Sequence, residues 1–110
     1  MEERRRYKRK TVHFPVRYRF NLEGVIQDWK SSDAGNVSAG GLFMTFGEKL
    51  EVGRLLELSF SVPGREAPIN VKGKIVRVRE VVADTLLECG LEFTDIKPED
   101  RVFIDDFAKK

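Results

Sequence analysis

Apolar and polar residues alternate along most of the chain, which is the pattern of strands that bury one face. The first alternation runs from Val12 to Phe20, and Pro15 lies among its polar positions. Because proline cannot donate to a ladder hydrogen bond, Pro15 predicts an edge position or a bulge near the start of this strand. Comparable alternations follow at 42–46, 56–62, 69–79 and 87–93. The pattern therefore predicts a mainly β protein.

Two strands are less regular. One is expected somewhere within residues 25–37, interrupted at 31–35, where Ser, Asp and Gly disfavour strands. The alternation of 69–79 changes phase between Ile75 and Val76, which indicates a β-bulge.

The period changes at the end of the chain. Proline suits the first position of a helix and acidic side chains suit its first turn, as in Pro98, Glu99 and Asp100. Residues 97–108 are thus expected to form one helix that covers an end of the fold. Six strands and a final helix predict an all-β class, namely a six-stranded antiparallel β-barrel with a C-terminal α-helix.

The length of 110 residues fits one domain, expected to comprise a flexible basic arm (1–10), the barrel (11–94) and the helix. The single cysteine, Cys89, excludes an internal disulfide and fits a reducing compartment. No apolar run approaches the roughly 18 residues of a membrane span, and no secretion signal is visible. We expect a cytoplasmic protein without membrane insertion.

Charge is distributed unevenly. The first 19 residues carry eight basic and two acidic side chains, a balance of +6, whereas the other 91 carry 12 basic and 16 acidic ones, a balance of −4. Positive potential at one end favours a local anionic partner over bulk nucleic acid.

Within the arm, Arg5 and Arg9 are four residues apart. They point the same way in an extended chain, about 13 Å apart at roughly 3.3 Å per residue, and they are neighbours in a helical turn. Both guanidinium groups can therefore address one ligand. Such groups grip phosphate, stack on purines and match the guanine O6 and N7 acceptors. Taken alone, the run also fits a solvated tail.

A polar turn at 36–41 is the second candidate. Gly40 and Gly41 permit φ > 0 and close backbone approach, so that N–H groups there could face an anion. Ser38 adds a hydroxyl group, and the Asn36 side-chain oxygen can accept from the N1–H and N2–H groups of guanine. These residues also suit an ordinary β-turn.

Other chemistry is not indicated. The single histidine, His13, and Cys89 cannot build a metal site or a catalytic triad, and the acidic pairs at 99–100 and 105–106 suit a solvated helix face. Trp29 is expected as a surface or core aromatic, with base stacking as the alternative. No enzyme activity, metal or cofactor is expected. Arg77 and Arg79 share a strand face and either extend the cationic surface or pair with acidic residues.

The two candidates together resemble the PilZ domain, a bacterial receptor module for cyclic di-GMP. The resemblance rests on Arg5-x-x-x-Arg9 preceded by Arg4, and on Asn36-x-Ser38-x-x-Gly41 after a strand. Residues 73–77 and 89–93 are also similar to the family's fifth and sixth strands, so the resemblance covers essentially the whole chain.

The resemblance implies that Arg5 and Arg9 contact phosphates and the major-groove edge of guanine. It also implies that Asn36, Ser38 and Gly41 hold the other guanine and nearby phosphate oxygens. Gly40 and Arg77 complete the expected ligand-binding set, and Arg4 favours a stacked ligand dimer. The family admits Asp or Asn at position 36, and Asn lacks the charge that would strengthen hydrogen bonds from guanine.

The expected function is a cyclic di-GMP receptor that signals by ordering its arm and thereby changing a surface. A downstream protein or a second copy would recognise that surface, and the chain is expected to be a monomer or weak homodimer. Two alternatives remain: a small barrel that binds single-stranded nucleic acid through the arm, and a PilZ-like adaptor without a ligand.

Overall fold

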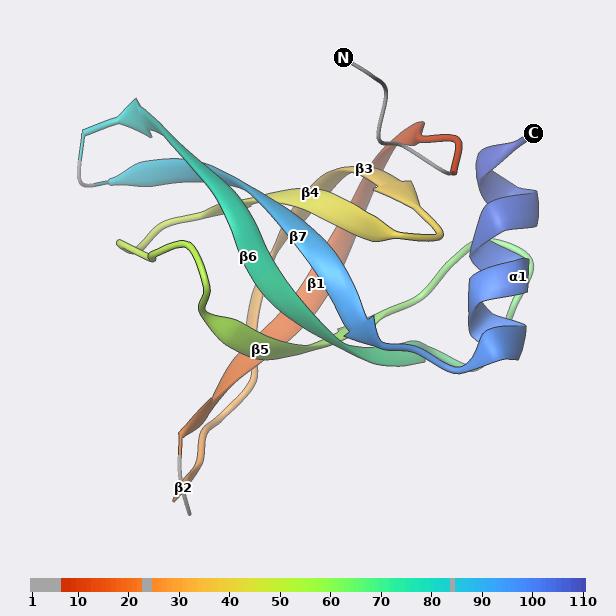
Figure 1. Ribbon diagram of the computed structural model, residues 1–110, viewed down its shortest axis with the longest axis horizontal. Coiled ribbons are helices and arrows are strands. Elements are labelled where there is room, and N and C mark those ends of the chain that lie inside the picture. The colour runs from red at the N-terminus through yellow and green to blue at the C-terminus, as the bar shows by residue number, and fades with distance from the viewer. Residues whose placement is uncertain (1–6, 23–24, 84) are drawn as a thin grey trace.

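The strands form a closed antiparallel barrel in the computed structural model, which describes residues 7–22, 25–83 and 85–110 (Figure 1). In chain order the elements are β1 (Lys10–Leu22), β2 (Val25–Ile26), β3 (Lys30–Ser38), β4 (Gly41–Phe46), β5 (Leu55–Phe60), β6 (Ile69–Val82), β7 (Leu86–Asp95) and α1 (Pro98–Ala108). The sheet order is β2-β1-β3-β4-β7-β6-β5, and pairing of β1 with β5 closes it. The prediction of a six-stranded barrel with a C-terminal helix is confirmed. The short β2, which pairs only with the end of β1, was not predicted.

The core consists of the inward side chains of the six long strands. In β4 and β7 every second residue is buried, as the alternation predicted. The largest side chains with almost no exposure include Phe46, Met44, Leu56, Leu58, Ile69 and Ile75. Cys89 belongs to this core, and burial raises the pKa of its thiol to about 11. The thiol is therefore protonated and unreactive at neutral pH.

The first strand has the predicted irregularity. Its pairing with β3 shifts register between Thr11 and Phe14, so the bulge predicted from Pro15 is present. The alternative of an edge position is wrong, because β1 pairs with β3 on one side and with β5 on the other. The β5 ladder begins at Val16, directly after the proline, so Pro15 interrupts no β1–β5 pair.

The predicted interruption at 31–35 is wrong, since β3 continues through it. Neighbours on both sides, β1 and β4, pair with this segment, and Ala34 is buried. Tertiary pairing therefore outweighs the low strand propensity of its Ser, Asp and Gly residues. A register shift between Ala34 and Asn36 is the only remaining irregularity with β4. The phase change in β6 is confirmed as a shift between Ile75 and Arg77.

Helix α1 packs on the barrel through Ile104, which is fully buried with the core. Asp100 corrects an expectation, because it is not solvated but only 3% exposed. The Arg65 guanidinium lies 2.6 Å from Asp100 Oδ1 and also lies over the Phe103 ring. The ion pair thus ties the β5–β6 connection to the first turn of the helix. A buried carboxylate needs such a counter-ion.

Neutralising Asp100 should therefore destabilise the fold. We expect Asp100→Asn to lower the free energy of unfolding by about 2 kcal/mol, because Arg65 keeps its position but loses its counter-ion. Urea denaturation measures this difference. Glu99→Gln, an exposed first-turn residue with the same relation to the helix dipole, should change stability by less than about 0.5 kcal/mol. Equal effects of both variants would refute the role of the ion pair.

The close packing of β4 against β7 leads to a second prediction. A Cβ added to Gly41 would lie 1.9 Å from the Leu91 carbonyl oxygen. We expect Gly41→Ala to lower the free energy of unfolding by about 3 kcal/mol, since the backbone itself must move. Gly35→Ala is the matched control, because its Cβ would meet the Phe43 ring at an ordinary 3.8 Å. Similar melting temperatures for the two variants would contradict this account.

Candidate ligand-binding site

The hairpin between β3 and β4 carries the polar residues of the second motif. Ser38 pairs with Gly41 around a two-residue turn, so the turn is shorter than predicted and Asn36 and Ser38 are strand residues. Both side chains are half-buried, whereas Val37 between them is fully buried. Since alternate residues of a strand share a face, Asn36 and Ser38 lie together on the outer surface of the barrel.

Hydrogen bonds hold the turn in place. Ser38 Oγ accepts the N–H of Gly40 at 3.1 Å, and the Gly40 carbonyl accepts the N–H of Phe93 at 2.9 Å. The Gly40 N–H is thus engaged within the turn and does not face outward. Because the Ser38 oxygen already accepts, its O–H remains able to donate to a ligand.

Of the two possibilities that the glycines offered, a positive φ and close backbone approach, the structure has the second. Neither Gly40 nor Gly41 adopts a positive φ; among the described glycines only Gly53 and Gly64 do. Gly41 is required by the approach of Leu91, and a Cβ on Gly40 would lie 3.3 Å from Tyr7 Cδ2. Neither position has room for a side chain, because the Leu91 backbone packs against Gly41 and the Tyr7 ring packs against Gly40.

The end of the basic arm lies against this hairpin. Lys10 pairs with Val37 and Thr11 pairs with Asn36. Arg9 precedes Lys10 in the chain and therefore lies beyond the last pair, toward the Ser38 end of the hairpin. The Arg9 side chain is exposed. The Tyr7 ring packs on the turn at Gly40. Arg4 and Arg5 lie outside the described residues, and their ligand-binding roles stay predictions.

Helix α1 contacts the arm from the other side. The Arg101 guanidinium lies 5.8 Å from the centre of the Tyr7 ring, and Lys10 Nζ donates to the Lys110 carbonyl at 3.0 Å. Lys10 Nζ also lies 5.4 Å from the centre of the Phe107 ring. Residues 7–10 are thus held between the hairpin and the helix. Sequence reasoning missed Tyr7, although an aromatic residue within a cationic run is a usable signal, and it had no signal for Arg101.

Strand register extends the candidate site across the outer wall. Asn36 pairs with Phe43, Phe43 with Gly90, and Gly90 with Arg77, which crosses β3, β4, β7 and β6. Phe43 is half-buried and Gly90 adds no side chain beside it. The Arg77 side chain is exposed and makes no hydrogen bond or ion pair with another described residue. Arg79, on the same face, instead pairs with Glu88.

The side chains on this wall are of the kinds that bind ligands. It combines guanidinium groups, a hydroxyl, an amide and one aromatic ring, which suits a polar anionic ligand with flat rings. Over residues 7–22, 25–83 and 85–110, no cluster of three or more His, Cys, Asp or Glu side chains could hold a metal ion. In the same ranges no helix is long and apolar enough to cross a membrane.

Solved structures share this fold at low identity. The inhibitor of motility MotI/DgrA of Bacillus subtilis is 20% identical with a TM-score of 0.82, over 98% of this chain and 51% of that chain. The PilZ domain of YcgR from Escherichia coli, solved with c-di-GMP, is 17% identical with a TM-score of 0.65, over 93% and 86%. The K. pneumonia MrkH–c-di-GMP complex is 15% identical with a TM-score of 0.66, over 96% and 50%. The chain thus spans about half the length of MotI and MrkH.

Sequence comparison identifies the family directly. No protein of curated function matches the chain. The family model of the PilZ domain matches residues 3–110, nearly the whole chain. The chain belongs to the PilZ domain family.

Proposed function

We propose that the chain is a receptor for cyclic di-GMP that binds its ligand between the basic arm and the β3–β4 hairpin and catalyses no reaction. The observation that carries the proposal is the position of the arm: Lys10 pairs with Val37 and Tyr7 packs on Gly40. A cationic segment thereby meets the face that carries Asn36 and Ser38. Family membership and the c-di-GMP complexes of YcgR and MrkH support the choice of ligand.

The arm supplies the charge that two phosphate groups require. Residues 1–10 carry six basic and two acidic side chains, and Arg5 and Arg9 are spaced to reach one ligand. A guanidinium group forms two parallel hydrogen bonds to phosphate oxygens, which lysine cannot do. We assign Arg5 and Arg9 to the phosphates and to the O6 and N7 edge of guanine, and Arg4 to a second stacked ligand.

The hairpin supplies neutral groups for a guanine base. The Asn36 oxygen is positioned to accept from the N1–H and N2–H groups, and the Ser38 hydroxyl is free to donate. Gly40 lets the Tyr7 ring of the arm pack on the turn, and Gly41 lets β4 approach β7, so the two glycines bring the arm and the hairpin together beside the proposed site. Arg77 lies at the other end of the row that runs from Asn36 through Phe43 and Gly90. It marks the edge of the proposed site on β6.

Ligand binding would change the surface beside helix α1. The like charges of the arm repel one another, and two phosphates would offset them and favour an ordered arm. The helix would register this ordering, because Arg101 and Lys110 already contact Tyr7 and Lys10. A downstream protein, or a second copy of the domain, would bind the altered surface. A cytoplasmic location fits a receptor for an intracellular second messenger.

Isothermal titration calorimetry with cyclic di-GMP tests the assignment. We expect wild type to bind, and Arg5→Ala and Arg9→Ala to bind about 10- to 100-fold more weakly, because each loses charge-assisted hydrogen bonds. Ser38→Ala should weaken binding about five- to tenfold. Its melting temperature must be measured in parallel, since the Ser38 oxygen also accepts from Gly40.

Arg54→Ala is the control, because Arg54 is an exposed cation outside the proposed site, over the Phe20 ring. It should bind like wild type. No binding by wild type, or equal loss in all four variants, refutes the proposal. Tight, length-dependent binding of oligothymidylate without binding of cyclic di-GMP would instead establish the single-stranded nucleic acid alternative.

The Tyr7 contact makes a separate prediction about arm position. Tyr7→Ala removes the ring that lies between Gly40 and Arg101, so more of the arm must be ordered on binding. We expect about three- to tenfold weaker binding of cyclic di-GMP in calorimetry, with little change in melting temperature.

Tyr7→Phe retains the ring and should bind like wild type. Gly40→Ala should resemble Tyr7→Ala, since its Cβ would crowd Tyr7 Cδ2 at 3.3 Å. If Tyr7→Ala binds as tightly as wild type while Arg9→Ala does not, the ligand site stands but the positioning role of Tyr7 is wrong.

A further inference from the structure

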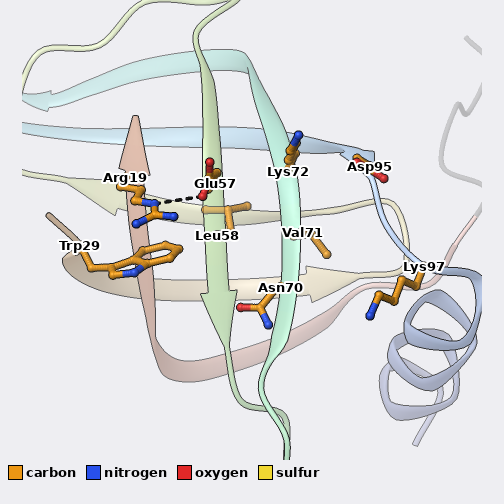
Figure 2. A pocket seen from close by; sticks show the side chains of 9 residues that line it. All are labelled: Arg19, Trp29, Glu57, Leu58, Asn70, Val71, Lys72, Asp95 and Lys97. Atoms are coloured by element: carbon orange, nitrogen blue, oxygen red, sulfur yellow. Dashed lines mark hydrogen bonds and ion pairs between the residues drawn. The ribbon is translucent and has the colours of Figure 1, made fainter. Parts of the chain in front are cut away.

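A groove with a volume of about 410 Å³ lies on the side of the barrel away from the candidate ligand site. Its floor is on β5, which is three strands from β4 in either direction around the closed sheet. Figure 2 shows Trp29 and Arg19 at one end of the groove and Asp95 and Lys97 at the other, with β5 and β6 between them. Two raised ends and a low floor make an open trough, not an enclosed cavity.

Strand register explains the shape of the groove. A row of alternating charge crosses four strands, because Arg19 pairs with Glu57, Glu57 with Lys72, and Lys72 with Asp95. The next row on the same face contains Ser59 paired with Asn70, whose short side chains keep the floor low. Cross-strand neighbours on one face lie within reach of one another, so one extended ligand could contact the whole row.

Trp29 forms an aromatic wall at one end. It lies in the segment before β3, is half-buried, and packs on two arginines of β1. The guanidinium groups of Arg17 and Arg19 lie 5.1 Å and 4.4 Å from the centre of the ring. These cation–π contacts fix the indole ring against the outer face of the barrel. The part of the ring that lines the groove is available to an apolar side chain.

Most polar groups of the groove are unused within the chain. Arg19 Nε donates to Glu57 at 2.9 Å. The side chains of Asn70, Lys72, Asp95 and Lys97 make no hydrogen bond or ion pair with any residue in the described part of the chain. Among the charged side chains that line the groove, Arg19 is paired with Glu57, and the cations Lys72 and Lys97 then outnumber one unpaired acid, Asp95. The unpaired charge is therefore net positive.

We propose that this groove docks an extended acidic peptide segment of a partner protein. An apolar side chain of the segment would pack on Trp29, and its carboxylates would face Lys72 and Lys97. Asn70 and Asp95 offer the acceptors that main-chain N–H groups require, and Asn70 also donates. A polyphosphate backbone carries a charge at every nucleotide and would meet the Glu57 and Asp95 carboxylates. A peptide can place its carboxylates at Lys72 and Lys97 and its neutral main-chain groups beside Asp95, so the groove favours a peptide over nucleic acid.

This inference does not depend on the proposed ligand. Strand β1 passes from the arm at Lys10 to the groove at Arg19, so the two sites share one strand without overlapping. A partner segment could therefore occupy the groove whether or not the other wall is occupied. Peptide docking can also be measured without any cyclic dinucleotide present.

Trp29 is the only tryptophan of the chain, so intrinsic fluorescence reports on the groove itself. The probe is a capped hexapeptide with a central leucine–phenylalanine pair and two aspartates on each side. We expect a saturable change in emission with a dissociation constant of about 10 to 500 µM, the range of transient docking. The same peptide with lysines in place of the aspartates should give no saturable change.

Lys72→Ala and Lys97→Ala should each weaken peptide binding about three- to tenfold. Lys74→Ala is the matched control, because Lys74 is a lysine of the same strand that does not line the groove. Trp29→Phe, followed by calorimetry, should bind more weakly while remaining folded by circular dichroism. Absence of saturation, equal loss in Lys72→Ala and Lys74→Ala, or equal binding of the lysine peptide would overturn the proposal.

Discussion

Lys10 pairs with Val37 and Thr11 with Asn36, and these two pairs decide where the basic arm meets the barrel. A strand that slipped by one residue would turn its whole outer face inward, so register here also decides which groups reach a ligand. The bulge between Thr11 and Phe14 changes the register of β1 on β3 between the two halves of the strand. After it, β1 pairs with both β3 and β5 and closes the sheet. The position of the arm at the Ser38 end of the hairpin is thus a consequence of the register of β1 on β3.

Helix α1 adds a second support to the same region. It packs Ile104 into the core and places Arg101 over the Tyr7 ring, and just after the helix the Lys110 carbonyl accepts from Lys10. These contacts are individually weak, since an exposed cation–π contact contributes only about 0.5–1 kcal/mol. A weakly held segment would suit the proposed response to a ligand, because a small differential affinity can then shift its population.

Local patterns predicted most of the fold, and long-range contacts account for most of the errors. The alternations of β4 and β7, the bulge in β6 and helix α1 follow from residues that are close in sequence. The continuity of β3 could not be predicted in this way, because it depends on partners in β1 and β4. Asp100 looked solvated for the same reason: its counter-ion, Arg65, lies 35 residues earlier. For the site, sequence reasoning identified the hairpin, and of the two properties that it allowed the glycines, close approach is present and a positive φ is not.

Those glycines bear on how the motif should be interpreted. The Leu91 carbonyl leaves no room for a side chain at position 41, and the Ser38 oxygen accepts from the Gly40 N–H. Gly40 and Gly41 therefore have structural roles whether or not a ligand binds. A barrel of this family that had lost its ligand would still need a residue without a side chain at position 41. It would have no such need for an amide at Asn36 or for the paired arginines of the arm. The presence of Arg5, Arg9 and Asn36 together is therefore the stronger argument for ligand binding, and it counts against the adaptor alternative more than the glycines do.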